Sequence, residues 1–181
     1  GKDAIAAEAV HWLCRTYIRN NQPQQAINRA QDALRSLDKS PFEINLRMDL
    51  SDALYETATG KKKAVNLYKQ IASNSPRHDL APQALYNAAF GEMELGNHKE
   101  SLALVKQFER AYGKHQLKQD AQYVAAESLL QLNRFDEAET AFKNLISENP
   151  RHAQRSQWQV RYGAALYIAK KYKPALELLD G

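Results

Sequence analysis

The feature that most constrains this chain is a repeat with a period of 37 residues. One column of small residues recurs at steps of 38, 37, 37 and 37 residues: Ala26, Ala64, Ser101, Ala138 and Ala175. Twelve positions before each of them lies a second column, small in four of its five units: Cys14, Asp52, Ala89, Ala126 and Gly163. A repeat of this length predicts an array of similar units that are stabilised by stacking on their neighbours.

Each unit is expected to contain two helices. Helix-forming residues dominate the composition, and runs of β-branched residues are missing, which disfavours an all-β fold. Gly60 and Gly96 stand where a helix should end and the chain reverse, and we expect both to adopt the left-handed conformation. The expected helices span residues 3–20, 23–37, 41–58, 61–74, 80–95, 98–112, 116–131, 134–148, 152–169 and 172–179.

On these residues the chain resembles the tetratricopeptide repeat (TPR) family over essentially its full length. The fourth unit matches the family pattern with Ala126, Ala138, Phe142 and Pro150, although the family's usual period is about 34 residues. The resemblance implies an all-α, right-handed α-solenoid of about five helical hairpins in a single domain, 1–181. The expected units are 3–37, 41–74, 80–112, 116–148 and 152–181.

The long linkers led by proline give a finer resemblance. They are similar to those in TPR domains of bacterial cell-envelope proteins, namely outer-membrane assembly lipoproteins and Tol-Pal-associated periplasmic proteins. This resemblance implies a periplasmic or cell-envelope location. Because Gly1 looks like the remnant of a tag, we also expect the chain to be a piece of a longer protein.

The same resemblance places the first helix of each unit along a concave groove. The groove residues that it implies are His11, Arg15, Asp49, Tyr86, Phe90, Met93, Tyr123, Glu127 and Tyr167. Aromatic side chains and methionine on such a surface are typical of peptide binding. We therefore expect a scaffold that binds a peptide or helix of a partner protein in this groove. Two alternatives stay open: curvature of the solenoid buries these residues, or the chain is a structural spacer or oligomerisation arm without a groove ligand.

The last helix leads to a further expectation. Leu176 and Leu179, together with Tyr172, would have no following hairpin to cover them. An apolar surface of this kind tends to find a partner. We expect this terminal packing surface to contact a second copy of the chain or a continuation of the same chain.

Residue types that carry chemistry are present without the arrangements that chemistry requires. The five histidines form no pair three or four residues apart, and Cys14 falls in the small, inward column. We therefore predict no enzyme, no metal site and no cofactor. The net charge of +4 is spread along the chain, which argues against nucleic acid as a partner. No apolar stretch approaches the roughly 20 residues of a membrane-spanning helix, so any membrane contact should be indirect.

Overall fold

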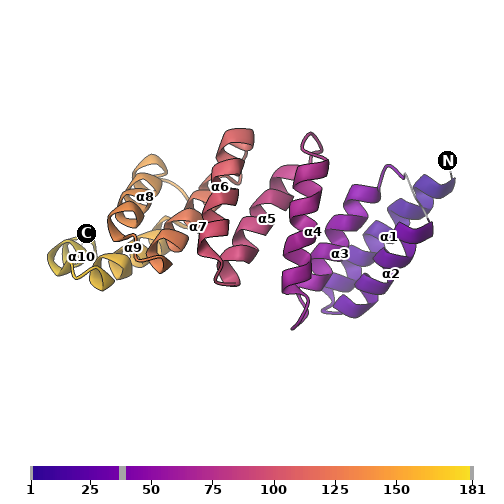
Figure 1. Ribbon diagram of the computed structural model, residues 1–181, viewed down its shortest axis with the longest axis horizontal. Helices are drawn as coiled ribbons and strands as arrows, with labels where there is room; N and C mark the ends of the chain where they lie inside the picture. The colour runs from indigo at the N-terminus through magenta and orange to yellow at the C-terminus, as the bar shows by residue number, and fades with distance from the viewer. Residues whose placement is uncertain (1, 37–39, 180–181) are drawn as a thin grey trace. The chain divides into compact units, whose positions relative to one another are not determined.

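The computed structural model describes residues 2–36 and 40–179, and over these residues it contains ten α-helices and no strand (Figure 1). This confirms the predicted all-α repeat fold, in which consecutive helices form helix–turn–helix pairs. The helices are α1 (Lys2–Arg19), α2 (Pro23–Ser36), α3 (Glu43–Tyr55), α4 (Lys61–Asn74), α5 (Ala81–Glu94), α6 (His98–Tyr112), α7 (Lys118–Gln131), α8 (Phe135–Glu148), α9 (Arg155–Ile168) and α10 (Tyr172–Leu179). Most bounds lie within one or two residues of those expected.

The largest difference is at α3, which is shorter at both ends than the expected 41–58. At its start, the Ser40 hydroxyl accepts a hydrogen bond from the Phe42 amide at 3.2 Å, which forms a turn before the helix. The Glu43 side chain pairs with Arg47 at 2.8 Å instead of reaching back toward Ser40. The first turn therefore lacks the reciprocal hydrogen bonds that would extend the helix to residue 41.

Four of the turns inside the helix pairs share one backbone geometry. A residue with positive φ follows the first helix in each: Asn21 (55°), Gly96 (78°), Asn133 (57°) and Lys170 (61°). The next amide in each turn bonds back to the carbonyl five residues earlier, as from Asn97 to Glu92 at 2.8 Å. These are Schellman caps, and they confirm the conformation predicted for Gly96.

The conformation predicted for Gly60 is wrong. Gly60 has φ −88° and directly precedes α4. The linker between α3 and α4 covers residues 56–60, so the reversal is spread over several residues and needs no left-handed glycine at its end.

The chain divides into two compact units, Gly1–Gly91 and Glu92–Gly181, and the division falls inside α5. In the first unit, α1 and α2 pack on α3. Cys14 and Ala53 are fully buried there, and the Cys14 thiol lies 3.6 Å from the Ala26 carbonyl oxygen. Ala53 is thus the small residue that packs inside this hairpin in place of Asp52. The Asp52 side chain does not occupy this buried position.

The second unit has its own hydrophobic core. Phe142 and Trp158 are at most 1% exposed, and α8 packs on both α7 and α9. Ala126 and Ala138, from the two small columns, lie in this core. No helix in the described ranges, 2–36 and 40–179, has the length and apolar character needed to cross a membrane.

Candidate functional site

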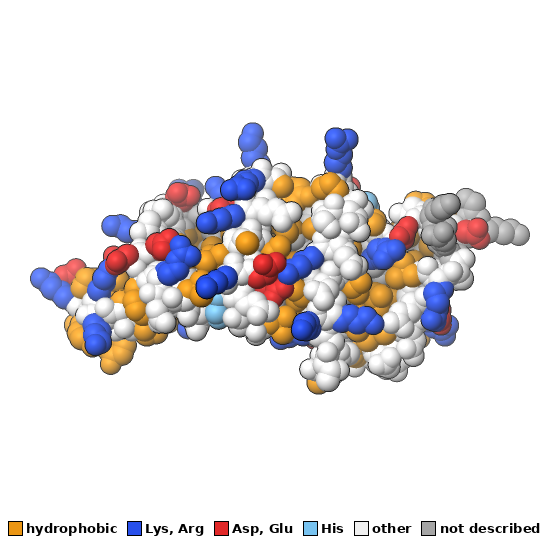
Figure 2. All heavy atoms as spheres, viewed as in Figure 1, with side chains coloured by type: hydrophobic (Ala, Val, Ile, Leu, Met, Phe, Trp, Pro, Cys, Tyr) orange, Lys and Arg blue, Asp and Glu red, His pale blue; other side chains and the backbone are white. Residues whose placement is uncertain are grey.

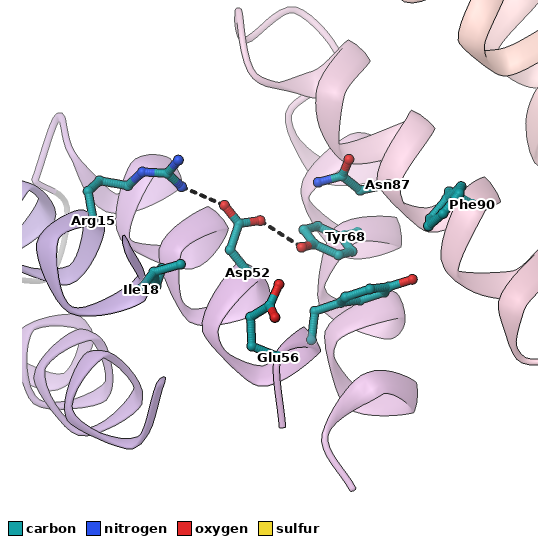
Figure 3. A pocket seen from close by; sticks show the side chains of 8 residues that line it. Arg15, Ile18, Asp52, Glu56, Tyr68, Asn87 and Phe90 are labelled. Atoms are coloured by element: carbon teal, nitrogen blue, oxygen red, sulfur yellow. Dashed lines mark hydrogen bonds and ion pairs between the residues drawn. The ribbon is translucent and has the colours of Figure 1, made fainter. Parts of the chain in front are cut away.

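A pocket of about 250 Å³ opens in the first unit among helices α1, α3, α4 and α5 (Figure 3). Its lining combines aromatic rings, an amide and charged groups. The lining residues are Arg15, Ile18, Asp52, Tyr55, Glu56, Tyr68, Asn87 and Phe90. Helices from three successive repeats thus contribute to one site.

Asp52 organises the wall between α1 and α4. The Arg15 guanidinium donates to one carboxylate oxygen at 2.6 Å, and the Tyr68 hydroxyl donates to the other at 2.6 Å (Figure 3). Burial raises the pKa of Tyr68, and the negative charge of Asp52 raises it further. Tyr68 therefore stays a neutral donor, and both oxygens of Asp52 are occupied.

A second pair of polar side chains lies beside this wall. His11 Nδ1 and Asp49 Oδ2 are 2.6 Å apart, and the Asp49 side chain is 1% exposed. Burial raises the pKa of Asp49 to about 6, although the hydrogen bond from His11 and the charges of His11 and Arg15 oppose this rise. An adjoining hollow of about 430 Å³ is lined by these three residues and by Asp52, Leu80, Gln83 and Asn87, among others.

Glu56 differs from the other two carboxylates because it is exposed and unpaired. Within the described residues its side chain makes no hydrogen bond or ion pair, and it reaches the pocket beside Tyr68 (Figure 3). Tyr55 already binds one cation through its ring, since Lys61 Nζ lies 5.1 Å from the ring centre. Aromatic faces and a free carboxylate together attract a positively charged group.

The structure brings together several of the residues predicted for the groove. His11, Arg15 and Asp49 form the cluster described above. Tyr86 and Phe90 lie one turn apart on α5, with stacked rings whose centres are 6.2 Å apart. Phe90 also lines the pocket, so predicted groove residues from three helices, α1, α3 and α5, lie in this part of the first unit.

The remaining predicted groove residues belong to the second unit. Met93 is half-buried near the end of α5, and Tyr123 on α7 packs edge-on against Phe142 at 6.3 Å. Burial raises the pKa of Tyr123 to about 12, with a further contribution from the neighbouring Glu127 carboxylate. Tyr123 therefore remains protonated at neutral pH.

Glu127 is buried, whereas Tyr167 is exposed. Glu127 is 6% exposed, and both of its oxygens accept from Arg161, the first at 2.6 Å. Its charge is thus neutralised inside the protein, as in the alternative in which packing between repeats buries the groove residues. Tyr167 joins Tyr172, at 5.3 Å between ring centres, in an apolar hollow between α9 and α10.

The predicted terminal surface coincides with this hollow. Tyr172 and Leu176 both line it and are exposed. Leu179 ends helix α10, and its side chain lies outside the described residues.

Of the eight residues that line the pocket, only Arg15 and Phe90 belong to the predicted groove set, and the other six include Asp52, Tyr68 and Tyr55. Asp52 did carry a signal, because it is the one charged residue in a column that is otherwise small. Tyr68 falls among the bulky residues that fill the space between repeats, so nothing in its position distinguishes a pocket residue from a packing residue. Tyr55 carries no signal at all.

Cys14 is placed as expected, inside the first unit. Its thiol is buried, and burial raises its pKa to about 12. A thiol of this kind is a poor nucleophile, which agrees with a packing role.

The repeat geometry defines a helical-repeat protein with an open pocket in its first unit. A tetratricopeptide repeat model matches residues 86–153 and 123–181, which together cover more than half of the chain. The chain belongs to the tetratricopeptide repeat family.

Solved structures share the fold at low sequence identity. A set of TPR-like repeats from Podosopora anserina, nearly identical to one another, is 19% identical to this chain. Its TM-score is 0.81, over 99% of this chain and 93% of that chain. MamA from Desulfovibrio magneticus RS-1, from its residue 41 to its end, is 14% identical, with a TM-score of 0.80 over 99% of this chain and 93% of that chain. A search among curated proteins found no significant match.

Proposed function

We propose that this chain is a protein-interaction scaffold that binds a segment of a partner protein in the pocket of its first unit. Tetratricopeptide repeats generally mediate protein–protein interactions, and their fold is typically non-catalytic. The observation that carries the finer proposal is the exposed Glu56 carboxylate, which has no partner within residues 2–36 and 40–179, at a pocket walled by Tyr68 and Phe90. An extended peptide or a helix could lie along helices α1, α3 and α5 and insert one side chain there.

The charges of the pocket favour a basic side chain from the partner. Arg15 is neutralised by Asp52, and His11 is paired with Asp49, so Glu56 is left with an uncompensated negative charge. A lysine or arginine would find a carboxylate and aromatic faces together. The site is therefore locally acidic in a chain whose net charge is +4.

A random-peptide display library selected on the immobilised chain would test this proposal. We expect the selected peptides to contain a lysine or arginine next to apolar residues. Measured by fluorescence anisotropy, Glu56→Gln and Phe90→Ala should each weaken the affinity by about tenfold, which corresponds to about 1.4 kcal/mol. Added salt should weaken binding to the original chain more than binding to Glu56→Gln, because the ion pair is exposed.

Matched controls are available outside the pocket. Glu109→Gln removes an exposed carboxylate on α6, and Leu95→Ala removes an exposed apolar side chain after α5. Both variants should bind like the original chain. Selected peptides without basic residues, together with unchanged affinity in Glu56→Gln and Phe90→Ala, would place the binding site elsewhere.

A second role is favoured by a separate observation. The hollow between α9 and α10 exposes a cluster of apolar side chains, which suits an oligomerisation arm. This role and peptide binding use different units, so both can be true of one chain.

A further inference from the structure

The three linkers that follow α4, α6 and α8 carry a histidine at the same repeat position. His78, His115 and His152 are spaced 37 residues apart, and the tripeptide that ends in His78 recurs at residues 150–152. Each histidine stands three residues before the helix that begins the next repeat, which is α5, α7 or α9. The histidine is therefore part of the repeat, although it belongs neither to the predicted groove nor to the pocket.

All three imidazole rings make the same hydrogen bond. Nδ1 of each ring accepts the backbone amide two residues further on: Leu80 to His78 at 3.1 Å, Leu117 to His115 at 3.2 Å, and Gln154 to His152 at 3.2 Å. The residues that directly precede α7 and α9, Leu117 and Gln154, make no side-chain cap of their own. The histidine side chain thus holds the turn that leads into each helix.

The turn before α3 has the same geometry with a different residue. Ser40 holds this position, 38 residues before His78. Its hydroxyl accepts the Phe42 amide at 3.2 Å, and its carbonyl oxygen accepts the Glu43 amide at 3.0 Å. The turn therefore requires an acceptor atom at this position, and a serine hydroxyl supplies one as well as an imidazole does.

Protonation separates the two kinds of acceptor. A backbone amide can only donate, so the bond requires an Nδ1 without a proton, and the ring proton must be on Nε2. A protonated imidazole carries a hydrogen on both nitrogens and cannot accept. Histidine in ordinary surroundings changes charge near pH 6.5, whereas serine does not titrate. Acid therefore removes the bond from the three histidine turns and leaves the Ser40 turn intact.

The surroundings of the rings modify this effect at one position. His152 stacks on Trp158 of α9, with ring centres 4.3 Å apart, and its charge interacts with that of Asp120 on α7. Both neighbours favour a charged ring, which offsets part of the loss at this turn. His115 meets the uncharged ring of Phe108 on α6 edge to face.

The charged neighbours of the other two histidines lie along the chain. Arg77 and Asp79 flank His78, and Lys114 precedes His115. Within residues 2–36 and 40–179, neither histidine forms an ion pair with a carboxylate. The turns at His78 and His115 should therefore respond most strongly to acid.

We propose that His78, His115 and His152 make the three turns pH-sensitive joints between repeats. At neutral pH the three hydrogen bonds are formed. As the pH falls below about 6, protonation breaks them, and the helix that follows each turn loosens on the repeat before it. The folded chain binds a proton at Nδ1 less readily than the unfolded chain, so the stabilisation is present above this range and is lost as the pH falls through it.

Nitrogen NMR of the 181-residue chain tests the bond itself. With nitrogen-15 in the histidine rings, the chemical shift distinguishes a protonated from an unprotonated nitrogen, and single His→Ser variants assign the signals. At about pH 8 we expect an unprotonated Nδ1 and a protonated Nε2 at all three linker histidines. A proton on Nδ1 at these positions would overturn the proposal.

Replacing the three histidines by the residue found before α3 separates the cap from its titration. The variant with His78→Ser, His115→Ser and His152→Ser keeps an acceptor in each turn but cannot be protonated there. Urea denaturation at about pH 8 and about pH 5.5 gives the folding equilibrium constant of each protein. The drop on acidification should be at least about fivefold larger in the original chain, which is the effect of one net hydrogen bond. Asp49 is present in both proteins, so its titration cancels from the comparison.

Two single variants complete the test. His98→Ser is the matched control, because His98 begins α6 and its Nδ1 has no hydrogen-bond partner among the described residues, so it should keep the pH profile of the original chain. His115→Ala removes the acceptor at every pH, so its folding constant should be about fivefold lower at about pH 8 and close to the original at about pH 5.5. A triple serine variant with the original pH profile, or a His115→Ala variant as stable as the original chain at about pH 8, would overturn the proposal.

Discussion

The pocket of the first unit depends on how single side chains are partnered. Asp52, Asp49 and Glu56 are three carboxylates on or next to one helix, yet they differ in state. Asp52 is held by Arg15 and Tyr68, Asp49 is buried against His11, and Glu56 has no partner among the described residues. Their different surroundings leave Glu56 as the carboxylate that is free to meet a ligand.

Asp49 should make the stability of the first unit depend on pH. Its pKa is about 6 in the folded protein and 3.8 without burial, so the folded state binds the proton more tightly. The contribution is therefore fully present below about pH 4 and is lost as the pH rises toward 6 and beyond. It lowers the free energy of unfolding by at most about 1.4 kcal/mol for each pH unit in that window.

Urea denaturation at several pH values, for the original chain and for Asp49→Asn, would measure this contribution. The groups that face Asp49 are His11 and Arg15 on α1 and Asp52 on α3, and all three are retained in the variant. The decline between pH 4 and pH 6 should be shallower in Asp49→Asn. Equal slopes in both proteins would show that Asp49 titrates normally.

Replacing Gly96 by a residue with a side chain should lower the stability of the protein, because of the backbone conformation at this position. Its φ is +78°, and a Cβ placed there would meet no atom within 4 Å, so only backbone strain opposes the change. Gly96→Ala should lower the free energy of unfolding by about 1 kcal/mol. Gly96→Asn should cost less, because Asn21 and Asn133 already adopt this conformation in equivalent turns. Thermal denaturation of both variants measures the two costs. An equal cost would show that asparagine has no advantage over alanine in this conformation.

At the scale of elements, neighbouring repeats are tied by polar contacts as well as by their cores. The Glu127 carboxylate on α7 receives two hydrogen bonds from Arg161 on α9, across one repeat. Lys171, which precedes α10, likewise bonds to Glu139 on α8 at 2.6 Å. These contacts fix the position of each hairpin on the one before it, in addition to the non-directional hydrophobic contact.

Removing Arg161 should reveal the cost of a buried carboxylate without its charged partner. Arg161→Met keeps much of the side-chain volume but leaves the buried Glu127 with only the neighbouring Tyr123 as a side-chain donor among the described residues, and we expect a loss of about 2 kcal/mol in stability. Glu127→Gln combined with Arg161→Met should cost less than the sum of the two single changes. A denaturation cycle of the four proteins measures this coupling. Purely additive costs would mean that the ion pair contributes nothing of its own.

The whole molecule combines two compact units of a repeat architecture with charge distributed over both. Figure 2 shows Lys and Arg side chains over the visible face, with Asp and Glu among them and no single concentrated basic patch on that face. In a repeat protein, each hairpin is stabilised mainly by its neighbours, so stability should vary along the chain.

Hydrogen exchange should follow this variation. Helix α10 packs on α9 and leaves Tyr172 and Leu176 exposed, whereas α7 and α8 are packed on both sides. Amides of α10 should therefore exchange faster than amides of α7 at low protein concentration. Mass-spectrometric exchange would detect the gradient. Uniform protection along the chain would contradict independent fraying of the last hairpin.

The sequence by itself determined the repeat, the helices and the small columns. These follow from patterns that act over one or two turns of helix: apolar spacing, small residues at close contacts and a glycine at a reversal. Gly96 and Cys14 were predicted correctly because their roles depend on their own repeat. The reversal at Gly60 was not, because it depends on the length of a linker without regular structure.

Only the tertiary structure decided which side chains are available for binding. Asp52 is paired with Arg15 from the preceding repeat, and Glu127 is paired with Arg161 from the following repeat, so neither carboxylate is free to bind a ligand. Such pairings join residues 34 or 37 positions apart, and they depend on distances of a few ångströms between stacked helices. A repeat pattern specifies which helices are neighbours, but the reach and direction of each side chain across the gap depend on the packed structure.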